Sequence, residues 1–212
     1  MTRLDADRAI DGRVAIVVHA ERVRVLVVGG GAVAERRALG FAVQGASVRV
    51  VAPRAEAALR DAAAAGTLDL TLRAYQSADI ADAELVIAAT NDRATNARVA
   101  ADARAAHRLC NVADAPDEGS FSSIAQRANG ALLVAVGANG VPAAATRILA
   151  AITTRFDARY DDALGALRSL RERLLARGGA SEWERASSAL IGDDFIARIE
   201  DGRVVRDSAG WE

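Results

Sequence analysis

The sequence predicts an α/β protein with a Rossmann-type doubly wound parallel sheet, followed by a C-terminal helical region. Short runs rich in Val, Ile and Leu alternate with Ala-rich stretches of helical composition over residues 23–112, which is the pattern of repeated β-α-β units. Gly29, Gly30 and Gly31 directly follow one of these runs, as they do in nucleotide-binding folds. From Thr146 onward no strand pattern occurs, and apolar residues recur at helical spacing.

The first βα unit of the predicted sheet surrounds the glycine segment. Residues 14–19 and 23–28 are β-branched runs of nearly continuous apolar character, which is typical of strands in a parallel sheet covered on both faces. Residues 32–44 have a helical composition, and Gly45 ends this helix. The next strand is expected at residues 47–52. Strand, glycine turn, helix and strand therefore complete one βαβ unit.

The same alternation continues along the chain. Helices are expected at residues 54–65 and 95–106. Strands are expected at residues 68–74, 84–89, 109–112 and 131–136. Because each strand is short and apolar and most are separated by a helix, we expect these segments to extend the same sheet.

The tail of the chain carries an apolar stripe of its own. The stripe consists of Phe156, Tyr160, Leu164, Leu167, Leu170 and Leu174. Ser181 and Glu184 have the spacing of a capping box, which predicts the start of a second helix. A tail of this size cannot hold a large core, so the stripe must pack on the sheet domain or on a second copy, and we favour the second copy. We therefore interpret residues 1–145 as a dinucleotide-binding Rossmann domain and residues 146–212 as a helical region for dimerisation and substrate binding.

Composition excludes several classes of function. The formal net charge is −1, whereas nucleic-acid-binding surfaces normally show a basic excess, so no nucleic-acid partner is expected. One Cys and two His offer no metal-ligand cluster, and no metal site is expected. Residues 1–12 include acidic side chains and no apolar segment, and no apolar run approaches the ~20 residues that span a bilayer. A cytoplasmic protein without a membrane partner is the simplest interpretation.

The glycine segment fits the dinucleotide-binding fingerprint. Gly29, Gly31 and Ala34 occupy its three fixed positions, after a predicted strand and at the start of a predicted helix. Gly29 allows the tight turn, Gly31 lets the backbone approach the pyrophosphate, and Ala34 lets helix and strand pack closely. Unpaired N–H groups at the helix start then face the phosphates. We predict dinucleotide binding, and a purely structural glycine turn is the alternative.

The end of the next strand leaves the choice between NAD and NADP open. NAD-binding units usually place an acidic residue there, about 20 residues after the glycines, to bind the ribose hydroxyls. This chain instead has Ala52, Pro53 and Arg54, with no acidic residue before Glu56. Arg54 could bind a 2′-phosphate, whereas backbone contacts at Pro53 and Arg54 suit either dinucleotide.

Polar residues also follow two later strands of the predicted sheet. In doubly wound sheets ligands bind beyond the carboxyl ends of the strands, so Thr90 is a candidate to line the nicotinamide side. Asn91 and Asp92 suit this role or that of a helix cap. Asp114 follows the next strand and is expected at the same edge, where a carboxylate could accept a proton from a substrate. The alternative for Asp114 is a turn residue ahead of Pro116.

Three blocks of sequence together resemble the siroheme synthase N-terminal family. They are GGGAVAERR at residues 29–37, VIAATND at 86–92 and CNVADAP at 110–116, the last followed by Ser120-Phe121. The helical tail with Trp183-Glu184-Arg185 resembles the dimerisation region of that family. The resemblance covers nearly the whole chain and is most specific in the first 120 residues.

The resemblance implies an activity and a set of site residues. Members of the family are precorrin-2 dehydrogenases, and many are also sirohydrochlorin ferrochelatases, so it implies NAD-dependent oxidation of precorrin-2 by a homodimer, with ferrous iron as a second substrate in the bifunctional members. Asp114 matches the catalytic aspartate of the family. The expected cofactor contacts are Gly29, Gly31, Ala32, Val33, Pro53, Arg54, Thr90 and Asn111. Candidates to bind the carboxylates of the tetrapyrrole are Arg127, Arg147, Arg155 and Arg159.

The chain departs from the family pattern at residues 122–125 and 137–142, where family members have a Pro and a Gly-Gly, Ser-Pro turn. Both segments face the substrate in the family, so iron insertion stays open. Two other functions also stay open: a non-catalytic NAD(P)-binding sensor and a Rossmann dehydrogenase of another substrate. A sensor needs no carboxylate beside the nicotinamide, so Asp114 separates it from an enzyme.

Overall fold

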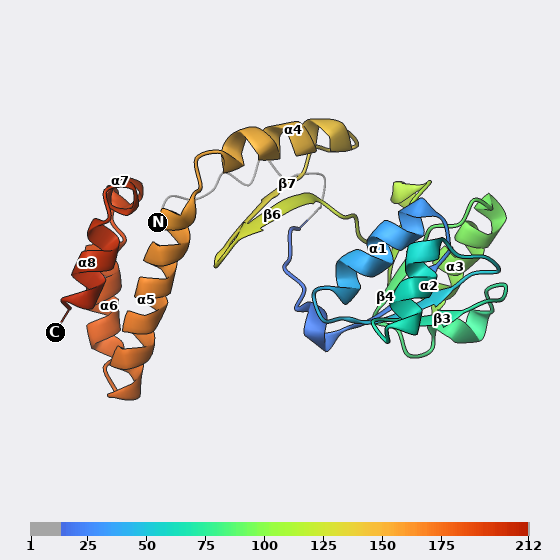
Figure 1. Cartoon of the computed structure of the whole chain (residues 1–212), viewed down its shortest axis with the longest axis horizontal. Helices are drawn as coiled ribbons and strands as arrows, with labels where there is room; N and C mark the ends of the chain where they lie inside the picture. Colours follow the sequence, from blue (N-terminus) through green and yellow to red (C-terminus); the bar gives the residue numbers. More distant parts are fainter. Residues whose placement is uncertain (1–13, 212) are drawn as a thin grey trace. The chain divides into compact units, whose positions relative to one another are not determined.

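The computed structural model describes residues 14–211, and the chain forms two compact units, Met1–Ser123 and Ile124–Glu212. The first unit contains a five-stranded sheet in the order β3-β2-β1-β4-β5, and all neighbouring strands are parallel (Figure 1). The strands are β1 (Arg24–Val28), β2 (Ser47–Val51), β3 (Asp69–Thr71), β4 (Leu85–Ala88) and β5 (Leu109–Val112). The strand order reverses between β1 and β4, which places a ligand-binding crevice at their carboxyl ends.

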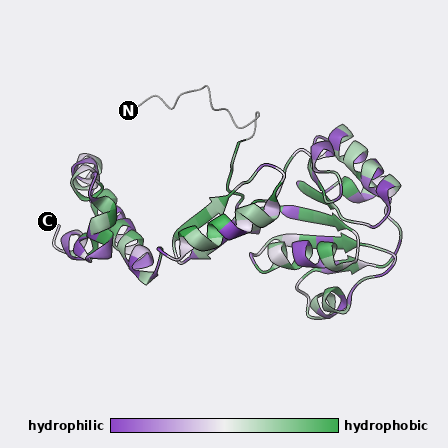
Figure 2. Cartoon of the chain, turned by 90° about the horizontal axis from the view of Figure 1, so that it is seen from above, coloured by the Kyte–Doolittle hydropathy of each residue, from purple (hydrophilic) through white to green (hydrophobic). Residues whose placement is uncertain are grey.

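Helices cover both faces of this sheet, as a doubly wound fold requires. They are α1 (Ala32–Ala42), α2 (Ala57–Ala64) and α3 (Arg93–Ala105). Val27 packs with Ala34 of α1 and Leu59 of α2, whereas Leu26 faces the other way and packs with Val99 of α3. The nearly continuous apolar strands are therefore buried on both sides, and Figure 2 shows them mostly in green. The predicted Rossmann-type fold class is confirmed.

The second unit combines a β-hairpin with helices. Strands β6 (Ala125–Asn129) and β7 (Leu132–Val136) pair antiparallel. The helices are α4 (Pro142–Thr153), α5 (Ala158–Ala176), α6 (Ala180–Leu190), α7 (Phe195–Glu200) and α8 (Arg203–Ala209). The hairpin turn is fastened to α5, because the Ala131 N–H donates to Asp161 Oδ1 over 2.7 Å. Leu167, Leu170 and Leu174 of the predicted apolar stripe lie in a core that α6, α7 and α8 complete.

Two of the predicted strands do not join the parallel sheet. Residues 14–19 form no strand, and Val14, Ile16 and Val17 are 84%, 67% and 68% exposed. Residues 131–136 contain β7, but β7 pairs only with β6 in a separate two-stranded sheet. Both segments have strong β propensity, which does not by itself choose a partner strand. The parallel sheet is complete without them.

The boundary between the units also lies elsewhere than the sequence suggests. The contacts divide the chain after Ser123, whereas composition places the boundary after residue 145. The difference arises because β6 and β7 pair with each other and pack on α4. The predicted capping box at Ser181 is wrong, since α6 begins after Gly179 without a side-chain cap. No helix of residues 14–211 is both long and apolar enough to cross a bilayer; residues 1–12, also considered in the sequence, lie outside the described part.

Candidate active site

The glycine turn between β1 and α1 forms a close-fitting cradle in the first unit. Gly29 has φ +133°, a conformation that residues with a side chain rarely adopt. A Cβ at Gly29 would collide with the Ala89 carbonyl oxygen, and one at Gly30 would collide with that of Arg54. A Cβ at Gly31 would meet nothing within 4 Å. The turn is therefore packed tightly on the protein side and open at Gly31, where a pyrophosphate can approach the backbone.

The start of α1 suits an anion. Its N-cap is Gly31, which has no side chain to bond the first N–H groups of the helix. Ala32 and Val33 are exposed at this end, while Ala34 is fully buried against the sheet. Free N–H groups and the positive end of the helix dipole favour negatively charged groups here. These features fit the phosphates of a dinucleotide.

The loop after β2 lies directly against the cradle. The Glu56 N–H donates to the Gly30 carbonyl oxygen over 2.8 Å, which ties the loop to the glycine turn. Pro53 and Arg54 are exposed at the end of the strand, and Ala52 is buried. This is the position at which Rossmann folds bind the adenosine ribose.

Asp92 and Thr90 organise the segment that follows β4. Asp92 caps α3 and accepts the N–H groups of Ala94 and Thr95 over 3.3 and 3.0 Å. Hydrogen bonds from Thr95 hold the pKa of Asp92 below its usual value. The helix-cap interpretation of Asp92 is therefore confirmed. Thr90 is half-buried at the end of the strand, and its hydroxyl donates to Asn96 Oδ1 over 2.7 Å.

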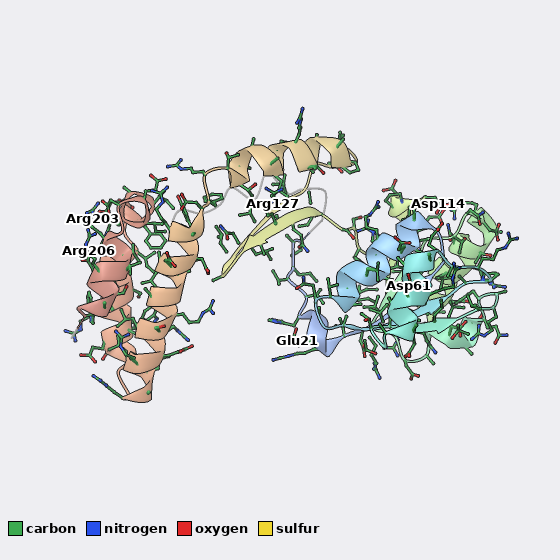
Figure 3. The ribbon with its side chains drawn as sticks, in the orientation of Figure 1. Glu21, Asp61, Asp114, Arg127, Arg203 and Arg206 are labelled. Carbon is green, nitrogen blue, oxygen red and sulfur yellow. The ribbon has the colours of Figure 1, made fainter. Side chains whose placement is uncertain are left out.

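Asp114 lies after β5 at the same carboxyl edge (Figure 3). Its side chain is 39% exposed and so within reach of a ligand. Asp114 Oδ1 accepts a hydrogen bond from Asn96 Nδ2 over 2.9 Å. Asp114 Oδ2 lies 3.9 Å from Arg93 Nε, and the same guanidinium pairs with Glu118. The carboxylate is therefore exposed, with one oxygen hydrogen-bonded to Asn96 and the other near Arg93, so a substrate could reach it.

Asn111 has a structural partner. Its side chain is 5% exposed, and its Nδ2 donates to the Phe121 carbonyl oxygen over 3.0 Å. Its Oδ1 is buried and has no hydrogen-bond partner within residues 14–211. The neighbouring Cys110 is buried as well, and burial raises the pKa of its thiol to about 11, so the thiol stays protonated.

The four arginines proposed for substrate carboxylates all lie in the second unit, and most already have partners. Arg127 donates to Thr153 Oγ1 over 3.3 Å, Arg155 pairs with Glu200 at 3.0 Å, and Arg159 pairs with Asp157 at 2.7 Å. Arg127 also lines a cavity of about 220 Å³ beside the hairpin. Ligand pockets usually measure roughly 300–1,000 Å³, so this cavity is too small for a tetrapyrrole. No group of three potential metal ligands occurs in the described part of the chain.

Sequence reasoning missed three contributors to this site. Gly30 received no role, although its contact with the Arg54 carbonyl forbids any side chain. Asn96 and Arg93 lie on α3; Asn96 belongs to the polar group that follows the predicted strand at 84–89, but only the contacts with Asp114 reveal what the two residues do. The run of three glycines was a usable signal for Gly30, whereas a polar residue inside a helix carries no comparable signal.

The fold and the site define a Rossmann-type dinucleotide-binding protein with a carboxylate at the binding edge. The chain belongs to the putative NAD(P)-binding family, whose model matches residues 16–125. NAD(P) is the dinucleotide class of this family, and the matched residues include the glycine cradle.

The chain is also similar to characterised proteins over a longer stretch. It is 43% identical over 157 residues to the siroheme synthase of Pseudomonas fluorescens (strain Pf0-1), which covers 71% of this chain and 33% of that protein. It is 41% identical over 185 residues to the siroheme synthase of Azotobacter vinelandii (strain DJ), covering 84% of this chain and 39% of that protein. The chain thus spans about a third of the length of these relatives.

A solved structure resembles almost the whole chain. SirC, a precorrin-2 dehydrogenase, superposes with a TM-score of 0.73 at 26% identity and covers 93% of this chain and 99% of SirC. The resemblance to the siroheme synthase family indicated by the three sequence blocks is confirmed by these relatives.

Proposed function

We propose that this chain is a dehydrogenase that oxidises precorrin-2 to sirohydrochlorin with NAD in siroheme biosynthesis. The observation that carries the proposal is the match to SirC, because it extends over nearly all of both chains. The siroheme synthase relatives support the same pathway. The site supports the reaction type, since a dinucleotide cradle and an exposed carboxylate lie at one edge of the sheet.

The reaction removes a hydride and a proton from the tetrapyrrole. NAD, when bound, takes up the hydride. The glycine turn and the start of α1 would hold the pyrophosphate, and Pro53 and Arg54 would lie beside the ribose. Thr90 would line the nicotinamide side, and Asn111 ties the end of β5 to the segment at Phe121. Asp114 accepts the proton that the tetrapyrrole loses together with the hydride, so charge and electrons balance between cofactor and protein.

The test combines purified protein, precorrin-2 and NAD, and follows the formation of sirohydrochlorin and of reduced NAD by absorbance. The proposal predicts the two products in equal amounts. If NAD binds and no oxidation follows, the proposal is wrong, and a sensor or a dehydrogenase of another substrate takes its place. Parallel runs with NADP decide between the dinucleotides, a choice that depends on Arg54.

A second activity, insertion of ferrous iron into sirohydrochlorin, is favoured by one observation: relatives about 40% identical to this chain are named siroheme synthase, and siroheme contains iron. Iron would be a substrate, with ligands from the macrocycle itself. Addition of ferrous iron to the completed oxidation should then give a second absorbance change. An unchanged spectrum restricts the chain to the dehydrogenase step.

We further propose that the chain acts as a homodimer. The second unit exposes large apolar side chains at Ile124, Leu133, Val141, Ile148 and Ile152, each between 40% and 55% exposed. Val141 at the start of α4 and Ile148 and Ile152 within it recur at helical spacing, and contiguous exposed apolar patches are typical of an interface between proteins. A cytoplasmic location stays a prediction from the sequence.

A further inference from the structure

We propose that Asn96 is a positioning residue for the reaction: its buried amide sets the direction of the Asp114 carboxylate. This inference rests on the proposed function, because it assigns Asn96 a role through the proton acceptor. Asn96 lies on α3 and is 0% exposed. A buried polar side chain must find partners for its amide, and the partners of Asn96 all belong to the candidate site.

The amide of Asn96 joins the ends of two strands. Its Oδ1 accepts from the Thr90 N–H over 3.0 Å and from the Thr90 hydroxyl over 2.7 Å. Its Nδ2 donates to the Thr90 carbonyl oxygen over 3.1 Å and to Asp114 Oδ1 over 2.9 Å. Both hydrogens of Nδ2 are used, and Thr90 fixes which way the amide faces. Asn96 can therefore present only a donor to Asp114.

This donor holds one oxygen of the Asp114 carboxylate and so limits the directions that the group can face. Arg93 lies 3.9 Å from Asp114 Oδ2 and carries positive charge, but it also pairs with Glu118. Within residues 14–211, Arg93 is the charged residue that contacts the Asp114 carboxylate, and Glu118 is the charged residue that pairs with Arg93. The amide of Asn96 is a neutral contact that orients Asp114 from the buried side.

A purely structural role is the alternative, because the same bonds also join α3 to the ends of β4 and β5. The two roles differ in what a charge change at this position does. A structural residue affects the melting temperature, whereas a positioning residue affects kcat and the pH dependence of the reaction.

Asn96→Asp separates these roles. The variant keeps the size of the side chain and an oxygen for Thr90, but places a carboxylate opposite Asp114. Two carboxylates so close resist ionising together. We expect kcat to fall by about 10-fold or more near neutral pH and the acid limb of the pH profile to move to higher pH by about one unit or more. The KM for NAD should change by less than about 3-fold, because the glycine cradle is untouched.

Asp102→Asn is the matched control. Asp102 also lies on α3, and its carboxylate accepts a hydrogen bond from the Tyr75 hydroxyl over 2.9 Å, in contact with another part of the unit. The Asp102→Asn variant replaces a carboxylate with an amide, whereas Asn96→Asp replaces an amide with a carboxylate. We expect its kcat and its acid limb to match those of the unchanged protein.

A neutral variant covers the case in which Asn96→Asp fails to fold. Asn96→Ala should lower kcat, and the double variant with Asp114→Asn should be no slower than Asp114→Asn alone, because both changes act on one group. Additive losses, or an unchanged kcat and acid limb in Asn96→Asp, overturn the inference.

Calorimetric titration with NAD, without substrate, supplies a readout independent of activity. The inference predicts unchanged NAD affinity in Asn96→Asp, which keeps an oxygen for Thr90, and a loss of NAD affinity that accounts for the loss of rate contradicts it. Full activity of Asp114→Asn instead contradicts the proposed role of Asp114. The two failures are thus distinguishable.

Discussion

The parallel sheet of the first unit and the β-hairpin of the second bury their strands to different extents. In the first unit, Val25–Val28 of β1 are each at most 2% exposed, because helices cover both faces of the sheet. In the second unit, β7 alternates between half-buried and exposed residues, and Leu133 and Ile148 are 42% and 46% exposed. The dinucleotide site is thus built on a sheet that is covered on both faces, whereas the hairpin and α4 of the second unit leave apolar side chains exposed.

Gly30→Ala should give the largest effect, and it should be confined to the first unit. The new Cβ would collide with the Arg54 carbonyl oxygen and lie 2.9 Å from Ala55 Cα. Because both are backbone atoms, the cradle itself must shift, and we expect NAD affinity to fall by about 100-fold or more, or about 2.7 kcal/mol. Calorimetric titration with NAD measures the change.

Gly40→Ala is the control for this substitution. Gly40 lies within α1, and a Cβ there meets nothing within 4 Å. The change should leave NAD affinity intact and stabilise the helix by roughly 0.5–1 kcal/mol. Equal effects of the two alanines on NAD binding would contradict the account of the cradle.

Ile148→Asp should give the next largest effect, and it tests the second unit. A charged side chain in an apolar interface is left without a partner and opposes association. We expect the mass measured by light scattering to fall from that of a dimer to that of a monomer. Val43→Asp is the control, since Val43 is 72% exposed in the first unit and should leave the mass unchanged. A monomeric parent protein would refute the proposed homodimer.

The smallest effect concerns an ion pair of the first unit. Arg24 and Glu84 join the starts of β1 and β4, and hydrogen bonds from Arg24 lower the pKa of Glu84 from 4.5 to about 2. Because the pKa is lowered by folding, the stabilisation is present above about pH 4.5 and is lost as the pH falls toward about 2. Glu84→Gln should therefore show a flatter decline of melting temperature over this range. An identical decline in both proteins would rule out this contribution.

The first unit was predictable because several local signals agree there. Nearly continuous apolar strands, helix-stopping glycines and the fingerprint at Gly29, Gly31 and Ala34 all point to the same βαβ unit. The expected strands differ from β1, β2, β4 and β5 by only a residue or so at their ends. The family membership and the Rossmann-type fold follow from these signals.

The parts of the fold and of the site that the sequence did not predict depend on contacts between residues far apart in the chain. Strand β6 has the sequence Ala-Gln-Arg-Ala-Asn and is mostly exposed. Because its β propensity is low, the sequence does not predict a strand there. Residues 14–19 show the opposite case, with strong β propensity and no strand. In the site, the link from Asn96 to Asp114 joins residues 18 positions apart, and its existence depends on how α3 packs beside β5. Side-chain pairs of this kind cannot be read from composition or periodicity.

The most direct test of the account is the rate of precorrin-2 oxidation by Asp114→Asn compared with Asp117→Asn, in the presence of NAD. Asp117 is an exposed carboxylate three residues further along the chain, so it controls for the loss of charge near the site. The account predicts a fall in kcat of about 10²–10⁴-fold for Asp114→Asn, an unchanged rate for Asp117→Asn, and equal NAD affinity in both. Oxidation by Asp114→Asn at the rate of the unchanged protein would contradict it.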